Sequence, residues 1–233
     1  MTCLVAVVLC SCGKSPESPP VSSVSNPAAP TAKALPFSIE GVMLSDMFQN
    51  NLKVAKVNVG VNGGSAAEWV ATSIAIAEKV ATFGADSIEV SVRRNEVTES
   101  QGTRFREVTH AYYSPDPSHS VWDGDKKWEV LRADPAHLAT QQDVRISDDF
   151  ANLNQKLIDK GMNVDAADQK AGAAIAKKYH LSKNWRLPVG NSLNPVPRDS
   201  INVDATSATD ALAALANCMD GKIIRTMTTC DNK

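Results

Sequence analysis

The chain has 233 residues, 43% of them hydrophobic and 21% charged, which is enough for one medium-sized globular domain or two small ones. Its 24 Lys and Arg residues nearly balance its 26 Asp and Glu residues, so the formal net charge is −2. This balance excludes the strongly basic field of many nucleic-acid-binding domains and the acidic blocks of disordered tails.

The first feature along the chain is an apolar run over residues 3–9. It is far shorter than the roughly 20 residues that a membrane-spanning helix needs. The run leads into Leu9, Cys10, Ser11 and Cys12. A Leu three residues before a Cys, with a small residue directly before that Cys, resembles the lipobox of bacterial lipoproteins.

The resemblance implies a lipoprotein signal peptide over residues 1–11, cut before Cys12, and fatty acids such as palmitate attached to Cys12. In that family, a residue other than Asp after the lipidated Cys directs the protein to the outer membrane, and Gly13 stands there. We therefore expect a lipid-anchored envelope protein in the outer membrane, facing the periplasm. Because no Lys or Arg precedes the apolar run, we also expect the true start codon to lie upstream of Met1.

A tract rich in Ser, Pro and Ala follows, over residues 13–36. It contains six Pro and shows no hydrophobic period, so it cannot bury enough apolar surface to fold. We predict that residues 12–36 form the lipid anchor and a disordered tether, which would span about 25–30 Å on average. The alternative is that residues 4–9 form a buried strand, but a core strand is rarely followed by such a tract.

The five cysteines fit this scheme. Cleavage would remove Cys3 and Cys10, lipid would occupy Cys12, and Cys218 and Cys230 would remain. We predict a disulfide between these two in the oxidising envelope. The alternative is two unpaired thiols in a reducing compartment. A metal site at these cysteines is not expected, because no His or further Cys lies near them at ligand spacing.

Residues 54–93 are predicted to form a strand, a helix and a second strand. Apolar and polar residues alternate in both strands. Ser65 and Glu68 form a Ser-x-x-Glu capping box at the start of the helix, and Gly84 is expected at its C′ position. The apolar residues that carry these patterns are Val57, Val59 and Val61, then Trp69, Ile76, Val80 and Phe83, then Ile88, Val90 and Val92.

Two further strands are expected at residues 106–113 and 127–131, separated by a loop rich in Pro and Asp. The remainder is predicted to be mainly helical. One helix is expected from a cap at Ser147 to Gly161, one from a cap at Asp165 through Tyr179, and one from a cap at Ser207 to Met219. Three prolines make the stretch over residues 184–199 irregular, and residues 222–230 are expected to return as a strand.

These elements predict an α+β fold over residues 37–233, with a sub-boundary near residue 140. It would consist of a small sheet with a strand-helix-strand unit, followed by a mainly helical C-terminal part. The folded part resembles no family that its motifs identify.

Two motifs suggest ligands but have simpler explanations. The glycine-rich loop over residues 60–65 lies between a strand and a helix, where phosphate loops lie, but it lacks the Gly-x-Gly-x-x-Gly and Walker patterns. We interpret it as a turn, and no cofactor is expected. Residues 173–185 resemble the middle of a DNA-binding helix-turn-helix, but Pro188 would end the recognition helix too early. Binding to nucleic acid is therefore not expected.

The loop over residues 114–125 and the strand before it hold the richest polar cluster. Its members are His110, Asp116, His119, Asp123 and Asp125. They could meet a divalent ion or act as acid and base, but their spacing matches no ligand pattern, and Asp-Pro and Asp-Gly are common in turns. We predict a solvated loop without metal. No catalytic Ser, Cys or His-Glu-x-x-His motif is present.

Aromatic residues are sparse, at 5% of the chain, yet four of them cluster within 17 residues. They are Tyr112, Tyr113, Trp122 and Trp128. Such a cluster either fills the core of the sheet or anchors a protein interface, and both alternatives stay open.

The sequence thus favours a non-enzymatic function. We expect an anchored binding or assembly component of an envelope machine, such as a secretion or conjugation apparatus, with an envelope protein as its partner. The alternative is an envelope hydrolase with an unrecognised active site, and a cytoplasmic DNA-binding protein is a third, less favoured class. An exposed aromatic cluster would favour binding, whereas a deep cleft lined by His110, His119 and the loop aspartates would favour an enzyme.

Overall fold

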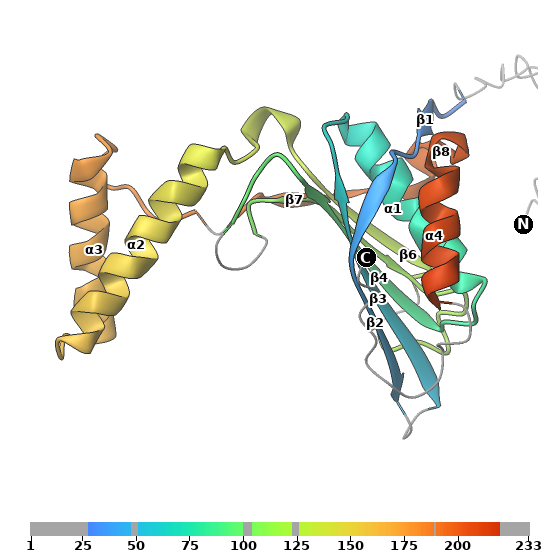
Figure 1. The fold of residues 1–233 in the computed structure, drawn as a ribbon, viewed down its shortest axis with the longest axis horizontal. Coiled ribbons are helices and arrows are strands. Elements are labelled where there is room, and N and C mark those ends of the chain that lie inside the picture. Colours follow the sequence, from blue (N-terminus) through green and yellow to red (C-terminus); the bar gives the residue numbers. More distant parts are fainter. Residues whose placement is uncertain (1–27, 48–50, 100–103, 123–125, 189, 220–233) are drawn as a thin grey trace, which may run out of the picture.

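The computed structural model describes residues 28–47, 51–99, 104–122, 126–188 and 190–219. It confirms the α+β class, with a mixed sheet, helices packed on the sheet and a helical region toward the C-terminus. The sheet has six strands in the order β2-β3-β4-β5-β6-β7 (Figure 1). They are β2 (Phe37–Met47), β3 (Leu52–Val61), β4 (Ser87–Arg94), β5 (Glu107–Tyr113), β6 (Trp128–Ala133) and β7 (Leu193–Val196).

The predicted strand-helix-strand unit is confirmed as β3, α1 (Ala66–Ala81) and β4. The two strands pair in parallel, and every other neighbouring pair in the sheet is antiparallel. Ser65 caps α1 through the predicted box: its side chain accepts from the backbone N–H of Glu68, whose carboxylate accepts from the N–H of Ser65. The helix ends earlier than expected, with its C-cap at Thr82. Gly84 lies in the following turn, at a φ of 81°.

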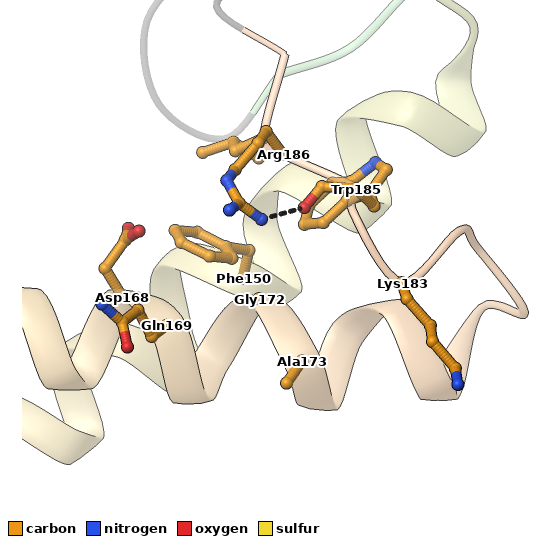
Figure 2. A pocket seen from close by; sticks show the side chains of 9 residues that line it. Phe150, Asp168, Gln169, Gly172, Ala173, Lys183, Trp185 and Arg186 are labelled. Atoms are coloured by element: carbon orange, nitrogen blue, oxygen red, sulfur yellow. Dashed lines mark hydrogen bonds between the residues drawn. The ribbon is translucent and has the colours of Figure 1, made fainter.

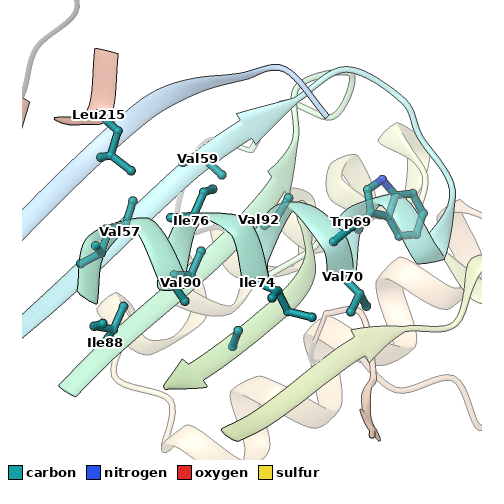
Figure 3. Close-up of a cluster of buried hydrophobic side chains, with 14 of the residues drawn as sticks. Val57, Val59, Trp69, Val70, Ile74, Ile76, Ile88, Val90, Val92 and Leu215 are labelled. Atoms are coloured by element: carbon teal, nitrogen blue, oxygen red, sulfur yellow. The ribbon is translucent and has the colours of Figure 1, made fainter. Parts of the chain in front are cut away.

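The main core lies between the sheet and α1. Because side chains alternate along a strand, one face of β3 and β4 presents only apolar side chains to the helix. Figure 3 shows these side chains meeting the inner face of α1, with Leu215 of α4 (Thr209–Met219) joining from the side. The fully buried members include Val57, Val59, Val70, Ile74, Ile76, Ile88, Val90, Val92 and Leu215. Burying a side chain of this size contributes about 1.5–3 kcal/mol.

The predicted tether is wrong over its last residues. The short strand β1 (Thr31–Lys33) pairs in parallel with β8 (Asn202–Asp204) and packs beside α1. Ala32 and Ala34 are buried there, and the backbone N–H of Leu35 donates to Thr72 Oγ1 at 2.7 Å. Their small side chains let the backbone approach α1 closely, which a compositional argument about Ser and Pro cannot detect.

Two strands of the main sheet were not predicted. The alternation of β2 is interrupted by a bulge between Ile39 and Gly41, so its period is broken in the sequence. Strand β7 contains Pro195 in the stretch that we expected to be irregular. Proline is tolerated there because β7 is the last strand of the sheet and need not donate to a further neighbour.

The helices α2 (Gln141–Asp159) and α3 (Val164–Lys178) form a hairpin that projects from the sheet (Figure 1). We call this hairpin, with the segment 179–187 that follows it, the arm. Its own small core is made by Ile146, Phe150, Ala171 and Ile175. Short 3₁₀ helices lie at Pro135–His137, Arg198–Ser200 and Thr206–Ala208.

Three predicted helix caps are wrong. The N-cap of α2 is Thr140, whose capping box uses Asp143, and Ser147 is buried in the helix interior. The N-cap of α3 is Asn163, two residues before the predicted Asp165. Ser207 instead lies in the short 3₁₀ helix before α4 and donates a hydrogen bond to the carbonyl of Ala34, the residue after β1.

Several predictions fall outside the described residues. These are the signal peptide over residues 1–11, Cys12, the tether up to residue 27, the strand at 222–230, and Cys230. Within the part of the chain that the structure describes, no helix has the length and apolar character needed to cross a bilayer.

Candidate functional site

The helices that pack closely on the described strands, α1 and α4, lie on one face of the sheet (Figure 1). We call the opposite face the open face. The alternation that turns Val57 and Val90 toward α1 turns Lys56 and Glu89 outward. Charged side chains therefore cross the open face from β2 to β5. This charged row consists of Glu40, Lys56, Glu89, Arg93, Arg106, Glu107 and His110.

His110 lies between two carboxylates. Its Nδ1 atom is 2.8 Å from Oε1 of Glu107, and its Nε2 atom is 3.2 Å from Oε1 of Glu89. The contact with Glu89 falls outside hydrogen-bond geometry, so we treat it as an ion pair. On its other side, Glu89 pairs with Lys56 at 2.7 Å.

These contacts set the charges. Burial lowers the pKa of His110, but the hydrogen bond to Glu107 and the contact with Glu89 outweigh it and raise that pKa to about 9. The contact with His110 lowers the pKa of Glu89 to about 2, with Lys56 contributing in the same direction against burial. Burial alone would raise the pKa of Glu107. Its hydrogen bonds to His110 and Ser91 lower this pKa by more than burial raises it, so the net shift is downward. All three groups are charged at neutral pH.

The other end of the charged row is an arginine pair around Glu40. Arg93 Nη1 lies 3.2 Å from one carboxylate oxygen of Glu40, and Arg106 Nη2 donates to the other. Arg93 also donates to Asn58 Oδ1 at 2.8 Å and to Ser91 Oγ at 3.2 Å. Because Ser91 in turn donates to Glu107 at 2.6 Å, the two ends of the row form one network.

Gly60 makes room for this network. A Cβ at residue 60 would lie 2.9 Å from Oε1 of Glu40 and 2.1 Å from Oδ1 of Asn95. Contacts that short would force the ends of both side chains to move, so glycine at residue 60 lets them lie across β3 in the observed arrangement. The glycine pattern predicted a turn over residues 60–65, but Gly60 lies in β3.

Beyond His110 the open face becomes aromatic. The ring of Tyr112 lies 4.6 Å from that of His110 and 4.9 Å from that of Trp122, which meets it edge to face. Tyr112 and Trp122 line a cavity of about 360 Å³ together with three other residues. We call this cavity the aromatic pocket, and its lining is Tyr112, Val121, Trp122, Lys126 and Glu129.

The loop before Trp122 is fixed to the sheet by the buried Ser87. The backbone N–H of Val121 donates to Ser87 Oγ at 2.9 Å, and the hydroxyl of Ser120 is 3.2 Å from the same atom. The N–H of Trp122 in turn donates to Ser120 Oγ at 3.0 Å. The aromatic pocket is thus held against β4 and β5 by hydrogen bonds.

The predicted aromatic cluster is divided between the two faces. Tyr112 and Trp122 lie on the open face, whereas Tyr113 and Trp128 stack at 4.0 Å and pack against the main core. Tyr113 and Trp128 are direct cross-strand partners, and consecutive strand residues point to opposite faces. The core alternative therefore holds for Tyr113 and Trp128, and an interface at Tyr112 and Trp122 stays a prediction.

The predicted polar cluster does not come together. His110 binds glutamates of β4 and β5, whereas His119 lies 3.9 Å from Asp86. Asp116 accepts from the N–H and hydroxyl of Ser118, as turn residues do. Asp123 and Asp125 lie outside the described residues. Within the described ranges no three His, Cys, Asp or Glu side chains are grouped as metal ligands, and the absence of metal stays a prediction.

The glycine loop and the helix-turn-helix resemblance also take ordinary structural forms. Gly63 and Gly64 have φ values of 63° and 98°, and the indole of Trp69 donates to the carbonyl of Gly63 at 2.8 Å. The loop is therefore a turn closed by Trp69. After α3 ends, the described residues from Ser182 form a turn and not a second helix.

A second cavity lies on the arm, with a volume of about 430 Å³. Figure 2 shows Phe150 at its centre, with Asp168 and Arg186 on opposite sides. The ring of Trp185 lies 6.1 Å from that of Phe150, edge to face. No motif in the sequence predicts this cavity, because its lining combines two helices with the segment that follows α3.

Cys218 lies on α4, is packed against the main core and is disulfide-bonded. Because Cys230 lies outside the described residues, the pairing of Cys218 with Cys230 stays a prediction.

Comparisons with known proteins add little. No family model and no curated protein matches the chain. Among solved structures, it is similar to the crystal structure of a DUF487 family protein from Desulfovibrio piger, with a TM-score of 0.49 and 18% identity. The match covers 71% of this chain and 96% of that one. A likeness this weak says nothing about function.

Proposed function

We propose that the chain is a lipid-anchored envelope protein that acts as a binding or assembly component of an envelope machine, such as a secretion or conjugation apparatus. Its open face would be the surface that meets the partner. The lipobox and the Ser/Pro-rich tether support the location, and the open face supports binding.

One observation carries the proposal. A sheet face that is left without a packed helix normally carries flexible polar side chains, but here the charged side chains are linked to one another from β2 to β5. Most of them are partly buried, and the side chain of His110 is only 15% exposed. A network of paired charges is preorganised, so a partner with complementary groups need not order it on binding.

The same geometry gives no support to the hydrolase alternative, which calls for a deep cleft lined by His110, His119 and the loop aspartates. Among the described residues, His110 contacts Glu107 and Glu89, whereas His119 lies 3.9 Å from Asp86, so the two histidines have different partners.

Site-specific photo-crosslinking in growing cells tests the proposal. A photoreactive residue at Ser45 or Glu129 would lie on the open face without replacing a member of the charged row. The matched control places it at Ala174, which is exposed on α3 of the arm. We expect the two open-face positions to form an adduct with the same envelope protein, and Ala174 not to form it.

The outcome separates the two parts of the proposal. An adduct formed only from Ala174 would move the binding surface to the arm. Fractionation of the same cells reports on the location independently, because the proposal requires the adduct and the free protein in the membrane fraction.

A further inference from the structure

The aromatic pocket on the open face has two charged residues on its rim, Lys126 and Glu129. Both are exposed, and no ion pair engages either of them among the described residues. Glu129 is the cross-strand partner of Tyr112, so its carboxylate lies beside the ring. The pocket therefore offers one free cation and one free anion next to an aromatic wall.

Among the described residues, the charges near the pocket cancel. Lys126 and Glu129 are of opposite sign, and the neighbouring charges of Lys56, Glu89 and His110 are engaged with one another. A ligand with a net charge would gain attraction to one rim group and repulsion from the other. The pocket thus suits a neutral ligand.

The hydrogen-bonding groups define the ligand further. Lys126 and the indole of Trp122 can only donate, whereas the carboxylate of Glu129 can only accept. The Nε1 atom of Trp122 is buried and has no acceptor among the described atoms, which is unfavourable. A small turn of the ring would let this N–H donate to a ligand oxygen. Among neutral groups, a hydroxyl both donates to a carboxylate and accepts from an N–H, so several hydroxyls fit this rim.

The aromatic wall favours a saturated ring. Tyr112 lies between His110 and Trp122 and contacts both rings. The face of an aromatic ring is electronegative and attracts the weakly positive C–H groups of an apolar surface. A volume of about 360 Å³ is at the small end for ligand pockets, so it accommodates about one such ring.

We infer that the aromatic pocket binds a neutral sugar ring, with its C–H face on Tyr112 and Trp122 and its hydroxyls between Lys126 and Glu129. This inference rests on the proposed function only in taking the open face as a binding surface. It adds the chemical class of one ligand, a neutral sugar.

Nuclear magnetic resonance of the indole N–H groups tests the inference on the full chain, purified in detergent. The chain has four Trp, so labelling the indole nitrogens gives one resonance each for Trp69, Trp122, Trp128 and Trp185. The neutral probes are N-acetylglucosamine and glucose, at up to about 10 mM, which is roughly ten times a Kd of 1 mM. The charged probes are glucuronate and glucosamine.

We expect a neutral probe to shift the Trp122 resonance saturably, and each charged probe to bind more weakly. Glu129→Gln should weaken binding about tenfold, because it removes a charged acceptor. The matched control is Trp185→Phe on the arm, which should leave binding unchanged. The remaining indole resonances report whether each variant is folded.

The inference would be overturned by no shift at Trp122 with any neutral sugar, by a shift at Trp185 alone, or by tighter binding of a charged probe. A Trp122 shift with an aromatic peptide and not with sugars would also overturn it, and would make the pocket a protein anchor. Each of these results leaves the crosslinking test of the open face standing, so failure of the inference is distinguishable from failure of the proposed function.

Discussion

Glu107 and His110 are three residues apart on one strand, yet their side chains meet at 2.8 Å on the same face. An odd separation normally places two strand residues on opposite faces. Here the register of β4 and β5 shifts, so that Val92 pairs with Thr109 and Arg93 with Glu107, which leaves Val108 as an extra residue. This bulge turns Glu107 to the open face and completes the site around His110.

The first prediction concerns stability against pH. The folded-state pKa of His110, about 9, lies above its ordinary value of 6.5. Its stabilisation is therefore complete below pH 6.5 and is lost as the pH rises through 9, with an upper bound of about 3 kcal/mol. Chemical denaturation at pH 6, 8 and 10 should show this loss. In His110→Gln the loss should be absent, and an equal loss in that variant would assign the effect to another group.

Glu89 should act in the opposite pH range. Its folded-state pKa of about 2 lies below its ordinary value of 4.5, so its stabilisation is present above pH 4.5 and is lost as the pH falls through 2. Glu89→Gln should therefore be less stable than the wild type at pH 6 and nearly equal to it at pH 2. Thermal unfolding at the two pH values measures the difference. Equal destabilisation at both values would mean that packing, not charge, is responsible.

Gly60 should matter for stability, in contrast to Gly172. Gly60→Ala should destabilise the protein by about 1 kcal/mol, because the new Cβ displaces the side-chain ends of Asn95 and Glu40 from the network. In Gly172→Ala the nearest atom, on Phe150, would be 3.9 Å away, and the change should stabilise α3 by up to about 1 kcal/mol. The denaturant midpoints of the two variants measure both effects. A Gly60→Ala variant as stable as the wild type would contradict the close contacts around residue 60.

Lipid attachment at Cys12 has a direct consequence for location. Cys12→Ala should leave the precursor uncut and release the protein from the membrane fraction, because stable anchoring depends on acyl chains at that residue. Metabolic labelling with a fatty acid, followed by fractionation, measures both effects. Equal labelling of Cys12→Ala and the wild type would remove the basis for the envelope location.

A disulfide between Cys218 and Cys230 should pin the C-terminal segment to α4. In the chain-entropy model a loop this short stabilises by up to about 3 kcal/mol, so Cys230→Ser should lower the free energy of unfolding by about 2–3 kcal/mol. Peptide mapping without reductant identifies the pair. A free, alkylatable Cys230 in protein purified from the envelope would refute it.

The sequence predicted the interior of this protein better than its site. The strand-helix-strand unit could be recognised because Val57, Val59 and Val61 keep a strict period of two and Ser65 forms a capping box with Glu68. Strand β2 was missed because its bulge breaks that period. The caps at Thr140 and Asn163 were missed because other Ser and Asp residues nearby are equally good candidates.

The site escaped prediction for a related reason. The outward positions Glu89, Ser91 and Arg93 could have been listed from the alternation of β4, since they are the polar half of the same pattern. The partners across the face could not, because Glu40 and Glu107 reach it at bulges. The split of Tyr112 from Tyr113 follows from alternation alone and was available in the sequence.

The central claim is that the open face meets the partner. Lysine footprinting of the complex with the partner that crosslinking identifies tests this claim most directly. Lys56 and Lys126 report on the open face, and Lys170 and Lys183 report on the arm. Acetylation of the isolated protein and of the complex is compared by mass spectrometry. We predict that Lys56 and Lys126 lose reactivity in the complex while Lys170 and Lys183 keep it. Protection of the arm lysines with unchanged reactivity at Lys56 and Lys126 would contradict the claim.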